Sequence, residues 1–140
     1  MMTALELLIK LIKHFEGCRL KAYYCPAGVL TCGWGSTGKD ILPNTVWTQE
    51  YADKRLMSDA IMFLKATQKL CPNLEGEKLG AIADFAYNLG VGRLKSSTLR
   101  KKLNEGDFES ASRELKKWVN GGGKKLNGLV VRRDAEAEYL

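Results

Sequence analysis

The segment from Arg19 to Thr37 constrains the fold of this chain more than any other part of the sequence. Aromatic and β-branched residues, which are typical of strands, are mixed there with glycine and proline, which are typical of tight turns. Two short strands are predicted at about Arg19–Tyr24 and Val29–Gly33, joined by a turn at Cys25–Gly28. The sequence therefore predicts one small antiparallel sheet near the N-terminus.

Helical patterns occupy the remaining chain. Thr3 followed by Glu6 is typical of a capping box, and apolar residues follow it at helical spacing. Thr48 is the predicted N-cap of a long helix that ends just before Pro72. Shorter helices are predicted over residues 77–89, 98–104, 107–119 and 129–139. Neither a repeat nor a linker divides the chain, so we expect a single α+β domain over residues 1–140.

The charge of the chain is unevenly placed. The net charge is +6, and residues 91–140 carry 12 basic and 7 acidic side chains, against 10 and 9 in residues 1–90. This imbalance favours an anionic partner: nucleic acid, a lipid surface, or an acidic polymer such as a bacterial cell wall. Aromatic residues do not alternate with Lys or Arg along any predicted strand, so no motif supports nucleic acid. A mean hydropathy of −0.23 excludes a membrane-embedded protein.

The N-terminal residues and the cysteines bear on the cellular compartment. Charged residues interrupt the apolar ones of the first helix, so we find no secretion signal and expect folding in a cytoplasm. In a reducing compartment the four cysteines are expected to remain thiols. There is no CxxC pair, and His14, Cys18, Cys25 and Cys32 are spaced too widely for a zinc knuckle. We therefore expect no metal site.

Glu16 is the first candidate for acid–base chemistry. It lies beside Phe15 where the first helix meets the predicted sheet, and a carboxyl group partly removed from water retains its proton more readily. In a hairpin, Cys25 and Thr31 would lie close to the turn, and Glu16 would face them across a cleft. An acid opposite a nucleophile or base is what glycoside hydrolysis needs. The alternative is a solvated acid, a small buried thiol and an ordinary strand threonine.

The spacing of these three residues resembles that of the phage-type lysozymes, the endolysins of glycoside hydrolase family 24. In that family a Glu is followed after eight residues by Asp or Cys, and after five more by Thr. Glu16, Cys25 and Thr31 match this pattern within FEGCRLKAYYCPAGVLTCGWGST. The resemblance continues in the family's order with DFAYNLGVG, SSTLRKKLNEGDF and WVNGGGKKLNGLVVRRDAEAEYL, so it spans almost the full chain.

This resemblance implies a lysozyme-like fold. A small antiparallel sheet lobe (about 15–47) and a larger helical lobe (about 71–140) would be joined by a long helix (about 48–70). The first helix (about 3–15) is a candidate to pack on the helical lobe. The implied activity is hydrolysis of the β-1,4 bond between N-acetylmuramic acid and N-acetylglucosamine in peptidoglycan, in the cleft between the lobes. No metal or organic cofactor is implied.

The resemblance also implies a role for each matching residue. Glu16 would be the general acid that protonates the leaving glycosidic oxygen, and Thr31 would help to hold the attacking water. Cys25 stands where better-known members have aspartate. A thiolate there either orients and activates water, giving inversion, or attacks the sugar, giving a covalent intermediate and retention. We favour the water role, because it is the role that the resemblance gives to the aspartate.

Weaker candidates for substrate binding, and for contact with Glu16, lie in the second half of the chain. Tyr87 and Asn88 match the family's cleft-lining segment and are candidates to stack on, or hydrogen-bond to, a sugar; packing of a helix end into the core is the alternative. The family's C-terminal arginine segment suggests that Arg132 or Arg133 reaches Glu16 as an ion pair. A close cation favours the ionised carboxylate and opposes the effect of desolvation. The sequence alone does not decide which of these two effects is larger at Glu16.

Two other classes of function stay open at the level of sequence. A lytic transglycosylase needs one acid and would leave Cys25 and Thr31 dispensable, whereas a non-enzymatic cationic protein that binds cell wall or membrane would not need Glu16. For the favoured hydrolase we expect a monomer that acts on peptidoglycan. The resemblance implies that it stays in the host cytoplasm until a phage-encoded holin pore gives it access to the periplasmic cell wall.

Overall fold

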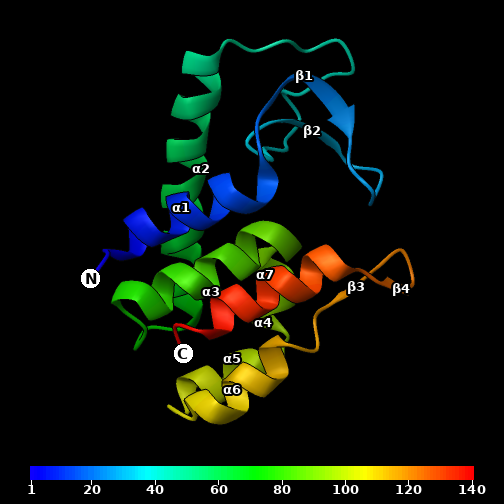
Figure 1. Ribbon diagram of the computed structural model, residues 1–140. Coiled ribbons are helices and arrows are strands. Elements are labelled where there is room, and N and C mark those ends of the chain that lie inside the picture. Colours follow the sequence, from blue (N-terminus) through cyan, green and yellow to red (C-terminus); the bar gives the residue numbers. More distant parts are fainter.

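A single β-hairpin forms the sheet of the smaller lobe in the computed structural model, which describes residues 1–140. Strand β1 (Arg19–Tyr24) pairs antiparallel with β2 (Leu30–Gly33), so the predicted hairpin is confirmed. Tyr23 lies opposite Thr31, and the register shifts between Arg19 and Tyr23. In Figure 1 the hairpin occupies one upper corner of the molecule, above the helices.

Helix α1 (Ala4–Glu16) leads into this hairpin. The predicted capping box is present, because the Thr3 side chain accepts a hydrogen bond from the Glu6 amide and the Glu6 carboxylate accepts one from the Thr3 amide. Gly17 ends the helix with φ 68°, a left-handed conformation that favours glycine. This sharp end leaves Glu16 at the junction between helix and sheet.

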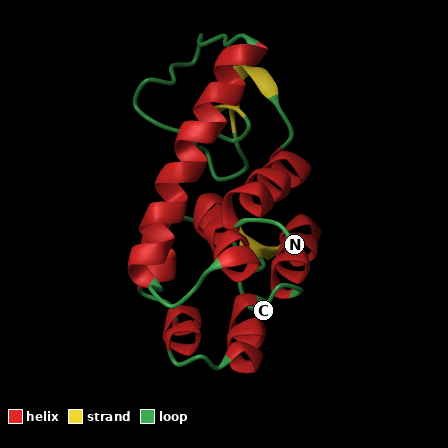
Figure 2. Ribbon diagram, turned by 90° about the vertical axis from the view of Figure 1, so that its left-hand side faces the viewer, coloured by secondary structure: helices red, strands yellow, loops and turns green.

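Helix α2 (Gln49–Leu70) connects the two parts of the molecule. Thr48 caps it as predicted, accepting a hydrogen bond from the Tyr51 amide. Its 22 residues rise through about 33 Å, which is about the width of a small domain. Figures 1 and 2 show that this helix runs along one side of the molecule, from the sheet lobe into the helical lobe.

Helix α3 (Gly76–Leu89) is the centre of the helical lobe. Eight of its residues are buried, and α1, α2 and α7 all pack against it. Short helices α4 (Val91–Lys95), α5 (Thr98–Asn104) and α6 (Phe108–Leu115) close the lobe from below in Figure 1. The largest apolar cluster of this lobe includes Leu79, Ile82, Phe85, Leu94, Leu99, Leu103 and Leu115.

The last part of the chain differs most from its predicted structure. The helix predicted over 107–119 ends at Leu115, and a second hairpin follows it, formed by β3 (Asn120–Gly121) and β4 (Lys124–Lys125). Its turn residues Gly122 and Gly123 have φ 59° and 79°, the combination that a tight hairpin turn requires. Helix α7 (Asn127–Ala137) completes the chain. None of the helices is both long and apolar enough to cross a membrane.

Candidate functional site

Glu16 lies at the junction of the two lobes, with its carboxyl group packed against Gly35. A Cβ atom at Gly35 would come within 2.7 Å of Glu16 Oε1 and 2.8 Å of its Cδ, closer than such contacts occur. Gly35 also has φ +85°, which a side chain would strain. The loop after β2 therefore uses a glycine to hold the carboxylate closely, while the Glu16 side chain remains 20% exposed.

Arg132 of α7 fixes the other side of this carboxyl group. Its Nη1 donates to Glu16 Oε2 at 2.7 Å, and its Nε and Nη2 donate to the two carboxylate oxygens of Asp84 at 2.9 and 2.8 Å. Asp84 lies on α3 and is completely buried. Because Asp84 accepts two of these three hydrogen bonds, it compensates much of the Arg132 charge before that charge acts on Glu16.

A second buried ion pair adjoins the first one. Arg133 donates to both oxygens of Glu136, at 2.7 and 3.0 Å, and neither side chain is exposed. Burial raises the pKa of Glu136 well above its usual value, and the hydrogen bond and charge of Asp84 raise it further. Burial also raises the pKa of Asp84, but hydrogen bonds with Glu136 and Arg132 outweigh this and hold it below its usual value. Of these two buried carboxyl groups, Glu136 is therefore the one that takes up a proton more readily as the pH falls.

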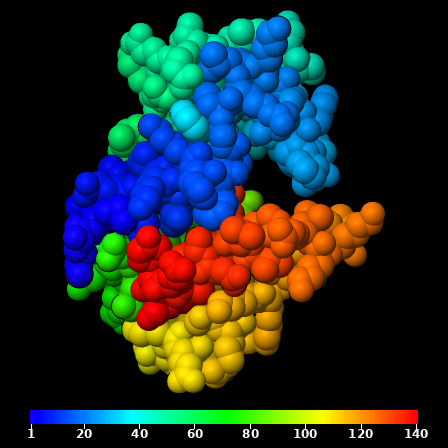
Figure 3. Space-filling view, viewed as in Figure 1, coloured from blue at the N-terminus to red at the C-terminus, as the bar shows by residue number.

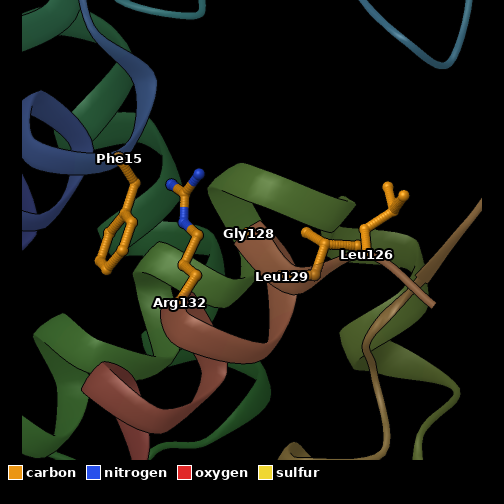
Figure 4. Close-up of a pocket in the computed structure, with 5 residues that line it drawn as sticks. All are labelled: Phe15, Leu126, Gly128, Leu129 and Arg132. Atoms are coloured by element: carbon orange, nitrogen blue, oxygen red, sulfur yellow. The ribbon is translucent and has the colours of Figure 1, made fainter.

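A pocket of about 350 Å³ opens beside Arg132 and is lined by Phe15, Leu126, Gly128, Leu129 and Arg132. Figure 4 shows Phe15 and Arg132 next to each other, with the two leucines at the start of α7 on the far side. The guanidinium carbon of Arg132 lies 5.4 Å from the centre of the Phe15 ring. Figure 3 shows a notch in the molecular surface here, between the β1–β2 hairpin and the β3–β4 hairpin.

The hairpin β1–β2 carries the other two predicted catalytic residues. Thr31 is buried, and its hydroxyl donates to the Val29 carbonyl oxygen at 2.9 Å. Cys25 is a partly exposed free thiol at the turn, and its amide donates to the same carbonyl oxygen. Neither residue makes a hydrogen bond to Glu16. The structure thus places both residues at the hairpin turn, as predicted, and joins only Arg132 directly to Glu16.

Tyr23 is a site residue that the sequence reasoning treated only as part of a strand. It lies opposite Thr31 and two residues before Cys25, so by the alternation of strand side chains all three share one face of the hairpin. The Arg19 guanidinium lies 4.2 Å from the centre of its ring. Burial raises the pKa of Tyr23, and the negative charge of Glu16 raises it further. Tyr23 therefore lies within electrostatic reach of the acid.

The predicted sugar-contacting residues are engaged within the protein. The Tyr87 hydroxyl donates to the Trp34 carbonyl oxygen at 2.8 Å, and burial raises the pKa of Tyr87. Asn88 Oδ1 accepts a hydrogen bond from Arg133 at 2.8 Å. Of the two arginines considered for Glu16, Arg132 contacts it and Arg133 is turned toward Glu136. A role of Tyr87 and Asn88 in sugar binding stays a prediction.

The comparison with known proteins decides the family. A family model described as Phage lysozyme matches residues 13–136. The chain belongs to the phage lysozyme family. Members of such a family differ in length, and this chain spans about half of one relative, the endolysin of Bacillus phage B103, which is 44% identical over 131 residues. That match covers 91% of this chain and 50% of the relative.

Other relatives match more of their own length. The SAR-endolysin of Bacteriophage PS119 is 36% identical over 124 residues, with 88% of this chain and 74% of that protein covered. Among solved structures, the endolysin from Escherichia coli O157:H7 phage FAHEc1 superimposes with a TM-score of 0.79 at 30% identity. It covers 95% of this chain and 89% of that one. This likeness confirms the predicted lysozyme-like α+β fold of the phage lysozyme chain described above.

Proposed function

We propose that this protein is an endolysin that hydrolyses the β-1,4 bond between N-acetylmuramic acid and N-acetylglucosamine in peptidoglycan, with Glu16 as general acid. The observation that carries the proposal is the position of Glu16: partly exposed at the junction of the lobes, held by Arg132, and adjoining a pocket that Arg132 itself lines. Membership of the phage lysozyme family and the relatives named endolysin support the same reaction.

In this mechanism Glu16 donates its proton to the glycosidic oxygen as the bond to the anomeric carbon breaks. Arg132 occupies Oε2, so we assign the transferred proton to Oε1. The bidentate contact of Arg132 with buried Asp84 fixes the guanidinium, which in turn holds the Glu16 carboxyl group in position.

We assign the attacking water to the hairpin. Cys25, as a thiolate, would take one proton from this water as its oxygen attacks the anomeric carbon, giving an inverted product. Because the Thr31 hydroxyl donates its hydrogen bond to the Val29 carbonyl oxygen, the hydroxyl oxygen is left to accept a hydrogen bond from that water. A direct attack of Cys25 on the sugar would instead give a thioglycoside and retention.

The test of the acid is Glu16→Gln, measured by the release of reducing ends from purified peptidoglycan. General acids of this kind contribute about 10²- to 10⁴-fold to rate, and we expect a loss in that range. Glu50→Gln, on an exposed surface pair with Lys54, is the matched control and should keep full activity. Lysis retained by Glu16→Gln would instead favour a non-enzymatic cationic protein, and anhydro-muramic products from the wild type would identify a lytic transglycosylase.

The test of Cys25 is a pair of variants. Cys25→Asp supplies the carboxylate of better-known family members and should retain activity, whereas Cys25→Ser lacks an anion at neutral pH and should lose most of it. Full activity of Cys25→Ser would exclude a direct role of the thiol. A glycosyl adduct on Cys25, found by mass spectrometry of the protein mixed with substrate, would exclude the water role.

We also propose that the protein acts as a monomer and reaches the periplasmic cell wall through a phage-encoded holin pore. Light scattering of the purified protein should give the mass of one 15.6 kDa chain. Cells that express the protein should lyse much faster when a holin is co-expressed. Equal lysis without the holin would contradict this route of access.

A further inference from the structure

The β3–β4 hairpin projects from the helical lobe at the mouth of the pocket, across the notch from the β1–β2 hairpin (Figures 1 and 3). Lys124 and Lys125 form its outer strand, and both are exposed. Neither lysine takes part in any of the ion pairs of the protein, whereas Arg132 and Arg133 are both paired with buried carboxylates. The hairpin therefore carries uncompensated positive charge beside the site.

Geometry separates these two lysines. Lys124 lies directly opposite Gly121 in the ladder, and residues opposite each other project to the same face. A Cβ atom at Gly121 would point at Leu126 Cδ1, 2.7 Å away, and at Leu129 Cδ1, 3.8 Å away. Both leucines line the pocket, so Lys124 is on the hairpin face that turns toward it. Lys125, one residue later, projects to the opposite face.

We propose that Lys124 is a specificity-determining residue that binds a carboxylate of the peptide carried by the muramic acid residue. This inference rests on the proposed function, because it names the part of the same substrate that reaches beyond the pocket. The peptides of peptidoglycan carry free carboxylates, and an exposed ammonium group with no internal partner is suited to bind one. The leucines beneath it would cover the apolar part of the same substituent.

The experiment combines lysine variants with a chemically altered wall. Wild type, Lys124→Ala and Lys125→Ala are each assayed for kcat/KM on native peptidoglycan and on peptidoglycan whose peptide carboxylates have been converted to amides with a carbodiimide and ammonia. Lys125 has the same charge and is also exposed, so it controls for general attraction to the anionic wall. Circular dichroism checks that each variant is folded.

We expect Lys124→Ala to lower kcat/KM on native peptidoglycan about three- to fivefold, the range for one partly exposed charge pair. Amidation of the wall should lower the wild type and Lys125→Ala by a similar factor and should leave Lys124→Ala unchanged. Equal effects of the two lysine variants, or a loss in Lys124→Ala that persists equally after amidation, would overturn the assignment. A wild type that cleaves neither wall would refute the proposed function itself.

Discussion

The two faces of the site are built by different means. On the helical face, Asp84, Arg133 and Glu136 are fully buried, and charge-assisted hydrogen bonds join Arg132 to Asp84 and Arg133 to Glu136. On the hairpin face, Cys25 is a partly exposed thiol, and main-chain hydrogen bonds define the geometry. Glu16 meets both faces: it accepts from Arg132 on one side and packs against Gly35 on the other.

This difference indicates how each face tolerates change. A buried charge that loses its partner keeps its desolvation cost, so damage on the helical face should appear first as lost stability. The hairpin holds no buried charged side chain, so a substitution there leaves no uncompensated charge and acts mainly by displacing the groups that position the site. Damage on that face should therefore appear first as lost activity in a protein that remains folded.

The largest effect is expected from Asp84→Ala. It leaves the buried Arg132 guanidinium with Glu16 as its only carboxylate partner, and breaking a buried pair in this way costs about 3–5 kcal/mol. Urea unfolding followed by circular dichroism measures this cost. Glu109→Ala, which removes an exposed surface pair with Arg113, should change stability by less than about 0.5 kcal/mol. Similar costs for both variants would mean that the buried pair contributes no more to stability than an exposed surface pair.

On the hairpin face, Gly35→Ala should act mainly on rate. The new Cβ would displace the Glu16 carboxyl group, and a misplacement of about 1 Å can cost about 10²-fold in activity. Gly106→Ala is the matched control, because Gly106 also has a left-handed φ of +75° but nothing within 4 Å of its Cβ position. Both variants share about 1–3 kcal/mol of backbone strain, so unfolding curves should agree while activities differ.

The variant Glu136→Gln tests the helical face through the pH dependence of folding stability. Because burial raises the pKa of Glu136 above its ordinary 4.5, the folded state binds this proton more tightly than the unfolded chain. That stabilising contribution is fully present below about pH 4.5 and is lost as the pH rises through the folded-state value. The pKa of Asp84 is lowered, so its stabilising contribution is constant above about pH 5 and is lost only as the pH falls further into the acid range.

Thermal unfolding between about pH 5 and pH 8 measures this effect. The wild type should lose stability relative to Glu136→Gln across this range, because glutamine cannot ionise. Exposed Glu138→Gln should give a difference from wild type that does not change with pH. A constant difference for Glu136→Gln as well would mean that the pKa of Glu136 is not raised in the folded protein.

The smallest effect is expected from Tyr87→Phe. It removes one hydrogen bond between α3 and the loop that carries Gly35, which costs about 1 kcal/mol in unfolding free energy. Tyr24→Phe on the exposed hairpin surface should be close to neutral. A large rise in KM for Tyr87→Phe with unchanged stability would instead support the predicted contact with sugar.

Local sequence patterns were sufficient to predict most of the helices and the first hairpin. The capping box at Thr3, the cap at Thr48 and the hairpin around Cys25 depend on neighbours in the chain, and all three are present. The resemblance of the C-terminal segment to that of the phage-type lysozymes also suggested an ion pair between Glu16 and Arg132 or Arg133. It could not choose between Arg132 and Arg133, because that choice depends on which face of α7 packs against α3.

The residues that the sequence reasoning missed all depend on distant partners. Asp84 and Glu136 lie 52 positions apart, and each shifts the pKa of the other only because two helices bury them together. Gly35 is one glycine among 14, and its contact with Glu16 is fixed by the loop after β2. The signal that could have identified Asp84 is its place among the apolar residues of α3, where an acid needs a cationic partner.

The ion pair between Glu16 and Arg132 joins residues 116 positions apart, and this has a consequence for synthesis. A ribosome that adds about 5–20 residues per second makes Glu16 about 6–23 seconds before Arg132. Helix α1 likewise waits for α3, the helix on which it packs. The nascent chain thus carries Glu16 early but cannot form this ion pair until α7 has left the ribosome, so the Glu16 carboxyl group is oriented only after both lobes have been synthesised.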